Sequence, residues 1–314
     1  MIDLKDVKFC DLTSKDTNSI LNLINIVQPE IPWSKEYLNW QYFNCPAGNA
    51  KIFGLKNNNN EVVSLYSSIP YLIQFNEHII EGSMAQDAMT HPNYRNRGYL
   101  HYLGELCLNN IKKDYKIGFA FPNEKSEKSL RRSGWKEFCL VPERKKLINN
   151  IVKTKHDLNF EEINENFDDT ISDIWKNSDQ KIGLKRDQNY LNWRYNKPGE
   201  KYFKFIINKN EGILILKIFN KKVLHLCDLF VKKDKINLVS DILIFSENFG
   251  KKNNCETITA WLPKDHKYST FYDKFKLILT LRKRYMFITC ENKKYSDLIS
   301  PEKWYLSQGD SDVY

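Results

Sequence analysis

Long apolar runs, a signal-like start and paired cysteines are all missing from this chain of 314 residues. No run approaches 18 apolar residues, so no stretch is typical of a membrane-spanning helix. The first residues, Met1-Ile-Asp-Leu-Lys-Asp, lack the basic and then apolar form of a signal peptide. The seven cysteines are scattered, without Cys-x-x-Cys pairs or histidines at ligand spacing, which predicts reduced thiols and neither a disulfide framework nor a metal site. We therefore expect a cytoplasmic protein without a metal.

The charge is unbalanced, with 48 Lys and Arg against 39 Asp and Glu, a net charge of +9. The excess lysines are spread along the chain and form no dense stripe. Such a balance attracts anionic small molecules and is also compatible with nucleic-acid binding, but no helix-turn-helix, zinc-finger or aromatic RNA-binding signature is present. Hydrophobic residues make up 41% of the chain, which is enough for packed cores and for two domains of ordinary size.

The most informative stretch covers residues 82–111. Residues 83–90 are short, half apolar and free of Gly and Pro, which predicts a strand that ends before Pro92. From Tyr99 the apolar residues recur at steps of three and four, which predicts a helix whose buried face carries Leu100, Leu103, Leu106, Cys107 and Ile111. The chain thus reads as strand, basic loop and amphipathic helix.

The loop between this strand and helix is Tyr94-Arg-Asn-Arg-Gly-Tyr99. A basic loop at a helix N-terminus offers free backbone N–H groups and the positive end of the helix dipole to an anion. Gly98 allows a sharp turn, and Arg95 and Arg97 add charge-assisted hydrogen bonds to phosphate oxygens. The alternative is a solvated basic surface loop.

A second segment follows at a fixed distance. Residues 119–126 read as a strand and an Asn-x-x-Ser helix start, and Gly134-Trp135 closes the unit. The two segments together resemble motif A and the closing motif of the Gcn5-related N-acetyltransferase (GNAT) superfamily, with Leu100 where the superfamily usually has Gly or Ala.

The resemblance implies acetyl-CoA or another acyl-CoA as cosubstrate. It places the thioester against main-chain groups at the end of the 83–90 strand and the pyrophosphate at the basic loop. The implied binding residues are Ala88, Met89, Thr90, Arg95, Asn96, Arg97, Gly98, Tyr99, Leu100, Asn123 and Ser126.

Acyl transfer to an amine also needs a base. Asp87 is the first candidate, with Gln86 and His91 as neighbours; for Asp87 a structural cap is the alternative, and for His91 a structural loop role. The acidic tail offers another base, since in some two-domain relatives the C-terminal carboxylate reaches the active site; Asp310, Asp312 or Tyr314 could do so here, against the alternative of a frayed tail.

The superfamily's usual acid is a Tyr seven residues after the Asn that opens the last motif helix. That position is Leu130 here, so either another hydroxyl protonates the thiolate or the thiolate leaves unaided. Tyr94, Tyr99 and Tyr102 lie near the loop, although each is also explained as a packing aromatic.

A repeat divides the chain. Tyr37-Leu-Asn-Trp-Gln-Tyr42 recurs as Tyr190-Leu-Asn-Trp-Arg-Tyr195, and similar strand-like runs follow each copy. We interpret this as a tandem duplication, with an acyl-CoA-binding domain at 1–150 and a degenerate acceptor-binding domain at 151–314. The second copy has no Arg-x-x-Gly at the equivalent place. Trp40 and Trp193 are assigned to the two cores.

The sequence therefore predicts an α/β (α+β) protein of two tandem GNAT-like domains, each a mixed twisted sheet flanked by helices. The tandem arrangement resembles nucleotide-sugar N-acyltransferases of polysaccharide biosynthesis, which implies direct transfer, in a ternary complex, to the amine of a dTDP- or UDP-linked amino sugar. The rivals are N-acylation of another amine (antibiotic, peptide or polyamine), a catalytically idle GNAT-like binding module and nucleic-acid binding by the basic surface. No membrane insertion or nucleic-acid partner is expected; a second copy of the chain is a further candidate partner.

Overall fold

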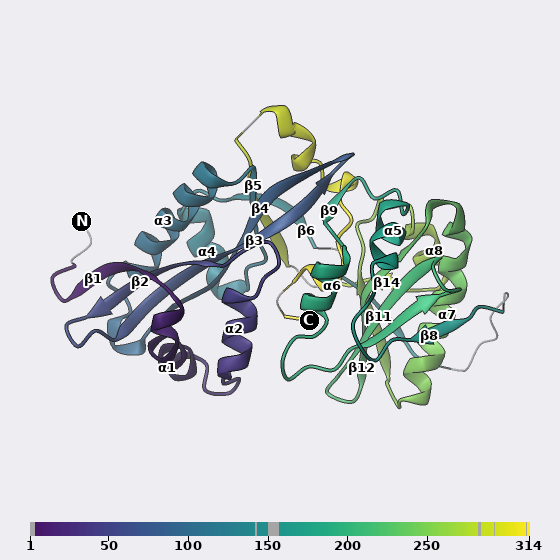
Figure 1. Cartoon of the computed structure of the whole chain (residues 1–314), viewed down its shortest axis with the longest axis horizontal. Coiled ribbons are helices and arrows are strands. Elements are labelled where there is room, and N and C mark those ends of the chain that lie inside the picture. The colour runs from purple at the N-terminus through teal and green to yellow at the C-terminus, as the bar shows by residue number, and fades with distance from the viewer. Residues whose placement is uncertain (1–3, 142, 150–156, 282–283, 292, 312) are drawn as a thin grey trace. The chain divides into compact units, whose positions relative to one another are not determined.

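A computed structural model describes residues 4–141, 143–149, 157–281, 284–291, 293–311 and 313–314. The chain divides into two compact units, which are described one at a time. Unit 1 comprises residues 1–72, 80–139 and 284–299, and unit 2 comprises residues 73–79, 140–283 and 300–314. Each unit therefore draws on segments from both halves of the sequence (Figure 1).

Unit 1 is built on a mixed sheet with the strand order β1-β2-β3-β4-β5-β15-β6. Its strands are β1 (Val7–Leu12), β2 (Lys51–Asn57), β3 (Val62–Phe75), β4 (His78–Thr90), β5 (Ile117–Ala120), β15 (Tyr285–Thr289) and β6 (Lys136–Leu140). Its α-helices are α1 (Thr17–Val27), α2 (Lys35–Phe43), α3 (Tyr99–Asp114) and α4 (Glu124–Arg132). Neighbouring strands are antiparallel from β1 to β3, whereas β4 and β5 run parallel.

The core of unit 1 forms where α3 covers the sheet. Leu103, Cys107 and Ile111, at helical spacing on α3, pack against Phe53 and Leu55 of β2. The predicted helix face is confirmed, with Leu100 and Leu106 partly buried at its margin. This packing holds the N-terminus of α3 next to the end of β4.

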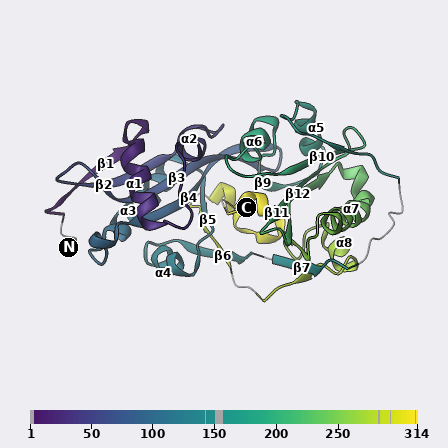
Figure 2. The same ribbon diagram turned by 90° about the horizontal axis from the view of Figure 1, so that it is seen from below.

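Unit 2 repeats this plan with the strand order β14-β7-β13-β12-β11-β10-β8. Its strands are β7 (Glu143–Leu147), β8 (Phe160–Glu162), β10 (Phe203–Ile207), β11 (Gly212–Phe219), β12 (Val223–Val231), β13 (Thr257–Trp261) and β14 (Ile278–Leu279), and β9 (Ile182–Leu184) pairs with the end of β3. Its α-helices are α5 (Thr170–Lys176), α6 (Gln188–Arg194), α7 (Val239–Lys252) and α8 (Ser269–Lys274). Figure 2 shows α7 and α8 side by side.

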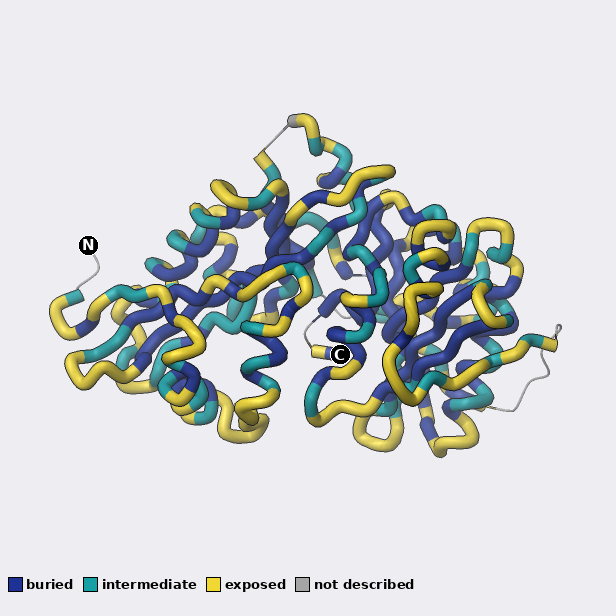
Figure 3. Tube along the Cα trace, viewed as in Figure 1, coloured by how far each residue is buried: buried dark blue, intermediate teal, exposed yellow. Residues whose placement is uncertain are grey.

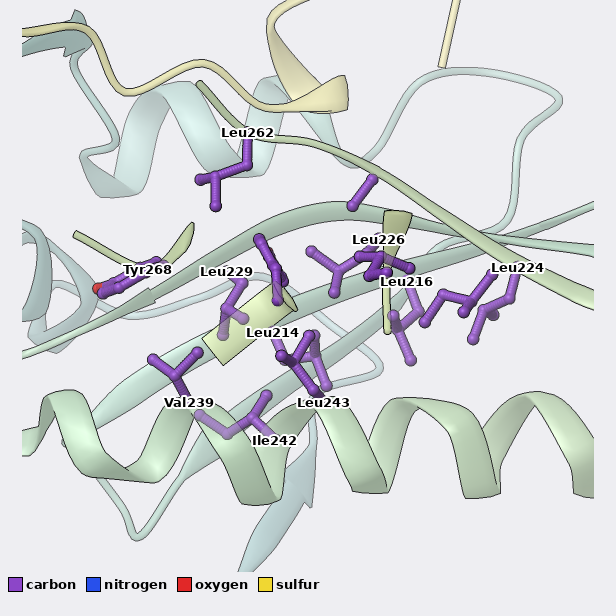
Figure 4. Close-up of a cluster of buried hydrophobic side chains, with 14 of the residues drawn as sticks. Leu214, Leu216, Leu224, Leu226, Leu229, Val239, Ile242, Leu243, Leu262 and Tyr268 are labelled. Atoms are coloured by element: carbon purple, nitrogen blue, oxygen red, sulfur yellow. The ribbon is translucent and has the colours of Figure 1, made fainter. Parts of the chain in front are cut away.

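The core of unit 2 lies between its sheet and α7. Val239, Ile242 and Leu243 of α7 point toward leucines of β11 and β12, including Leu214 and Leu226 (Figure 4). Figure 3 shows these strands as buried over most of their length. Burial of such side chains stabilises a core by about 1.5–3 kcal/mol each.

The two sheets correspond strand for strand. Five neighbouring strands of one sheet have counterparts in the other: β1-β2-β3-β4-β5 correspond in order to β8-β10-β11-β12-β13. The repeated sequence words lie on α2 and α6. Both helices begin the same way, because Ser34 and Asp187 accept a hydrogen bond from the backbone N–H of Tyr37 and Tyr190. The predicted tandem fold is confirmed.

In each sheet, the strand that lies beyond these five comes from the other half of the sequence. β15, near the C-terminus, lies between β5 and β6 in unit 1, and β7, which precedes the second copy, lies between β13 and β14 in unit 2. The boundary predicted near residue 150 lies outside the described residues, since 150–156 are not described. The compact units change at 139/140, with residues 284–299 in unit 1 and residues 73–79 in unit 2, because strand pairing and not chain order defines each sheet.

Most of the described part of the tail is buried. Residues 304–311 are buried in unit 2, and Trp304 forms a parallel bridge with Ile182. Trp40 and Trp193 are both buried, as predicted. Among the described residues, no helix combines the length and apolar character needed to cross a membrane.

Two histidines of unit 2, the half-buried His225 and the buried His266, have lowered pKa values. Burial, with a smaller effect of Lys217 on His225 and of Lys267 on His266, lowers the pKa of His225 to about 4 and that of His266 to about 3. The imidazole of His266 is fully used when neutral, because Nε2 bonds Gln180 Oε1 at 3.0 Å and Nδ1 accepts from the Tyr268 N–H at 3.2 Å.

Because both pKa values lie below the ordinary 6.5, the unfolded chain binds more protons between about pH 6.5 and pH 3. We expect the free energy of unfolding to fall as pH is lowered from 7 to 4, and to fall less steeply in His266→Gln. Urea denaturation at a series of pH values measures both slopes. Equal slopes for the two proteins would contradict the assignment to His266.

Candidate functional site

The end of β4 separates from its neighbour in unit 1. The parallel ladder joins Gly82, Ser83 and Met84 to β5, but β4 continues for six further residues to Thr90. Within this extension Asp87 has a left-handed φ of 53°, which is rare for a residue with a side chain and breaks the strand geometry. The extension presents main-chain groups beside a gap in the ladder.

The basic loop follows this extension and turns into α3. Asn96 and Gly98 both have left-handed backbones, with φ of 65° and 80°, and Gly98 is the N-cap of α3. Arg95 is tied back to the strand because its Nε donates to the Thr90 carbonyl at 3.3 Å. The first N–H groups of α3 have no partner within the helix and point out of its N-terminus, which favours an anion there.

The strand end, the loop and the helix start surround one hollow of about 430 Å³. Its lining includes most of the residues predicted to bind the cosubstrate: Ala88, Met89, Thr90, Arg95, Asn96, Gly98, Tyr99 and Leu100. Residues 88–90, 94–96 and 98–101 thus line one concave surface. Binding of acyl-CoA in this hollow remains a prediction.

Sequence reasoning missed several lining residues. Val27 and Gln28 come from the end of α1, and His101 and Ser129 come from α3 and α4. Only the distant pairing of these helices with the loop brings them there. A single hydroxyl such as Ser129 carries no local sequence signal that could have singled it out.

Other predicted binding residues are placed differently. The lining of the hollow, as far as the described residues go, does not include Arg97, whose Nη1 lies 3.7 Å from Asp6 Oδ2 and whose guanidinium covers the Tyr94 ring at 5.1 Å. Tyr99 has its side chain in the core, so its contribution to the hollow is chiefly from the backbone.

Asn123 and Ser126 cap α4. The Ser126 N–H donates to Asn123 Oδ1 at 3.0 Å, and the Asn123 N–H donates to Ser126 Oγ at 3.1 Å. This reciprocal pair explains why these residue types open a helix. Leu130, at the position of the superfamily's usual acid, is buried in the core of unit 1.

Asp87 is held by side chains on two elements. The Tyr42 hydroxyl of α2 donates to Asp87 Oδ2 at 3.1 Å, and Gln86 Nε2 donates to the same oxygen at 3.2 Å. Burial, and then the charge of Asp87, raises the pKa of Tyr42 well above its usual value, so this phenol stays a donor. Asp87 itself is half-buried.

The remaining candidates have structural contacts. His91 accepts the Asn93 N–H on Nδ1 at 3.2 Å and so caps a short 3₁₀ turn. In unit 2, the main-chain oxygen of Tyr314 accepts from Arg194 Nη2 at 2.5 Å and from the Tyr202 hydroxyl at 2.9 Å. Asp312 lies outside the described residues. A catalytic role for any of them stays a prediction.

Unit 2 has its own hollow of about 490 Å³. Its lining is polar and of mixed charge, with Lys176, Lys181 and Lys185 against Glu77, Asp169, Asp179 and Asp187, and Trp175 adds an aromatic ring. Lys181 and Lys185 are paired with Asp179 and Asp187. The chemistry of this hollow suits a polar molecule that carries both donors and acceptors.

Comparisons with known proteins agree with this architecture. Residues 9–138, less than half of the chain, match the family model of the acetyltransferase (GNAT) domain. A search of curated proteins by sequence returned no match.

Three solved structures share the fold. A probable N-acyltransferase from Enterococcus faecalis has a TM-score of 0.69 at 12% identity, covering 90% of this chain and 72% of its own. The N-myristoyltransferase of Saccharomyces cerevisiae with bound myristoyl-CoA has a TM-score of 0.60 at 10% identity, with coverage of 92% and 83%. A tandem GNAT protein from the clavulanic acid biosynthesis pathway has a TM-score of 0.60 at 10% identity, with coverage of 91% and 98%.

Proposed function

We propose that this chain, an acyltransferase that carries a GNAT acetyltransferase domain, transfers an acyl group from acyl-CoA to the amine of a nucleotide-linked amino sugar. The observation that carries the acyl-CoA part is the hollow of unit 1, where the end of β4, the basic loop and the N-terminus of α3 converge. The sugar acceptor is the finer part of the proposal and rests on the likeness of the tandem arrangement.

The residues around this hollow fit acyl-CoA. Backbone N–H groups at the start of α3 and the Arg95 guanidinium suit a pyrophosphate, and the left-handed Gly98 lets the backbone approach it. The extension of β4 past the ladder offers main-chain groups of Ala88, Met89 and Thr90 to the pantetheine and the thioester. We also propose that Arg97, Asn123 and Ser126 contact acyl-CoA at the edge of this site.

Asp87 is the proposed base. In direct transfer a C–N bond forms and the thioester C–S bond breaks, and the acceptor ammonium gives up two protons. One proton passes to Asp87, directly or through water, and the other ends on the leaving thiol. Gln86 and Tyr42 orient the carboxylate, and His91 and Tyr314 are the reserve candidates for proton transfer.

Unit 2 is the proposed holder of the acceptor. Its polar hollow has the donors and acceptors that a sugar needs, and Trp175 offers a ring for a nucleobase or sugar face. The mixed charge of this hollow does not by itself favour a nucleotide diphosphate. The alternative is therefore an N-acyltransferase that acts on another amine. We place the reaction in the cytoplasm, in keeping with seven free cysteines.

Release of free thiol tests this function. The chain would be incubated with acetyl-CoA and several longer or hydroxylated acyl-CoAs, each against a panel of dTDP- and UDP-linked amino sugars. Turnover with one sugar pair is the expected result. Turnover only with peptides, polyamines or aminoglycosides would replace the acceptor, and acyl-CoA binding without turnover on any amine would favour the idle module.

Arg95 and Arg97 make a matched pair for the binding site, because they are two residues apart but only Arg95 lines the hollow. We expect Arg95→Ala to weaken acyl-CoA binding about tenfold through loss of one charge-assisted hydrogen bond, and Arg97→Ala to have a smaller effect. The rise in Tm at fixed acyl-CoA concentrations measures both. Equal shifts in the two variants and the parent would exclude the loop as the phosphate site.

A further inference from the structure

The two copies of the repeated word end in tyrosines that make the same contact. The Tyr42 hydroxyl of α2 bonds Asp87 of β4 at 3.1 Å, and the Tyr195 hydroxyl after α6 bonds Asp228 of β12 at 2.5 Å. Each Asp lies five residues beyond the first residue of its parallel ladder, since those ladders begin at Gly82 and Val223. Tyr42–Asp87 and Tyr195–Asp228 are therefore equivalent pairs.

Both carboxylates also stand at an irregularity of their strand. Asp87 has a positive φ, and the pairing of β11 with β12 skips one residue, Cys227, immediately before Asp228. A bulge re-aims the side chain that follows it. Both copies thus retain the tyrosine and a strand irregularity that turns the carboxylate toward it.

In unit 2, other side chains of the protein occupy the space around the Tyr195–Asp228 pair. Asp228 is fully buried, and its Oδ1 accepts from the Ser307 hydroxyl at 2.7 Å, the Tyr305 hydroxyl at 2.9 Å and Arg186 Nη2 at 3.3 Å. Gly309 lies so close that a Cβ there would be 2.2 Å from the Tyr195 hydroxyl oxygen. We call this arrangement the filled copy.

In unit 1 the carboxylate has a different setting. Asp87 is half-buried, and Tyr42 and Gln86 are among the groups that donate hydrogen bonds to it. Tyr42 is fully buried, so its hydroxyl cannot follow the carboxylate into solvent and instead fixes it in one direction.

We propose that Tyr42 is a positioning residue of the acyl-transfer site, which holds Asp87 toward the acceptor amine, and that Tyr195–Asp228 is a filled copy of the same site with no part in turnover. This inference rests on the proposed function, because it assigns Asp87 as the base. It adds a residue that the motif comparison had placed only in a repeated word.

The pH behaviour follows from the groups around the pair. Burial, and then the charge of Asp87, raises the pKa of Tyr42, with a smaller contribution from Tyr37 of α2, whereas a hydrogen bond with the Ser67 hydroxyl of β3 lowers it. A hydrogen bond donated to a carboxylate favours its charged form, so removal of the phenol hydroxyl favours the protonated form. A residue that only packed would not change this titration.

Tyr42→Phe and Tyr195→Phe test the proposal as a matched pair, because each deletes one hydroxyl from an equivalent contact. With the acceptor found by the thiol-release panel, we expect Tyr42→Phe to lower kcat roughly ten- to hundredfold, to move the acidic limb of the pH–rate profile to higher pH, and to leave KM for acyl-CoA unchanged. Tyr195→Phe is expected to lower Tm and to leave the limb in place.

A second measurement does not depend on turnover. The ¹³C carboxyl resonance of Asp87, identified by its absence in Asp87→Asn, is expected to titrate at higher pH in Tyr42→Phe than in the parent and unchanged in Tyr195→Phe. An unchanged titration in Tyr42→Phe, or the same change in both variants, overturns the proposal. If Asp87 shifts as expected but no amine is acylated, the proposed function fails and the positioning contact stands.

Discussion

Asp87→Asn is expected to lower kcat for N-acylation by about 10²–10³-fold, because the amide keeps the shape of the side chain but cannot accept the ammonium proton. KM for acyl-CoA is expected to stay near that of the parent, since the hollow proposed to bind it lies beyond Asp87 along β4. Steady-state kinetics with the substrate pair from the thiol-release panel measure both quantities. The acidic limb of the pH–rate profile should disappear with the carboxylate.

Asp114→Asn provides the control, because it removes a carboxylate of the same unit at the far end of α3, where Asp114 pairs with Lys51 near the surface. Its kinetics should match the parent. If Asp87→Asn keeps more than a tenth of the parent's kcat and its acidic limb, the base lies elsewhere. His91 and Tyr314 would then be the next positions to change.

Arg186→Met is expected to cause the largest loss of stability, about 3–5 kcal/mol, because it leaves buried carboxylates without their cation. The guanidinium is fully buried, and Nη2 lies 2.6 Å from Asp310 Oδ1 and 3.3 Å from Asp228 Oδ1. Burial, opposed by the Arg186 charge and reinforced by Asp228, already raises the pKa of Asp310 to about 6. Chemical denaturation at pH 7 measures the loss.

Two further variants distinguish the effect of the buried ion network on stability from the effect of removing any positive charge. Arg186→Lys keeps the charge but loses the planar fork and should be intermediate. Lys222→Met removes one partner of the exposed Lys222–Glu256 pair and should leave the denaturation midpoint unchanged. If Arg186→Met were as stable as the parent, the ion cluster around Asp228 would contribute nothing to holding the tail.

Local pattern was enough to predict the parts of unit 1 that are close in sequence. The strand at 83–90 is the second part of β4, and the helix predicted from Tyr99 is α3, because turn residues and apolar spacing report directly on these elements. The repeated word predicted the duplication, and α2 and α6 confirm it. Residues 88–90, 94–96 and 98–100 line one hollow, and Arg97 lies near Asp6; binding of acyl-CoA there stays a prediction.

Long-range pairing could not be predicted in the same way. Nothing in residues 143–147 or 285–289 states that each strand lies in the sheet of the other half, since register between distant strands depends on the whole sheet. The burial of the polar, acidic tail was equally hidden, because the charge of Asp310 is balanced by Arg186, 124 positions earlier. Tyr42 was noted only as part of the repeated word, because its contact with Asp87 needs both α2 and β4 in place.

The exchanged strands also constrain how the chain is made. A ribosome that adds about 5–20 residues per second needs roughly 7–30 s to pass from β6, which ends at residue 140, to the end of β15 at residue 289. Throughout that interval the nascent first sheet lacks the strand between β5 and β6 and exposes two open edges. The nascent chain thus passes through a long, pairing-prone stage in which chaperone binding would be most useful.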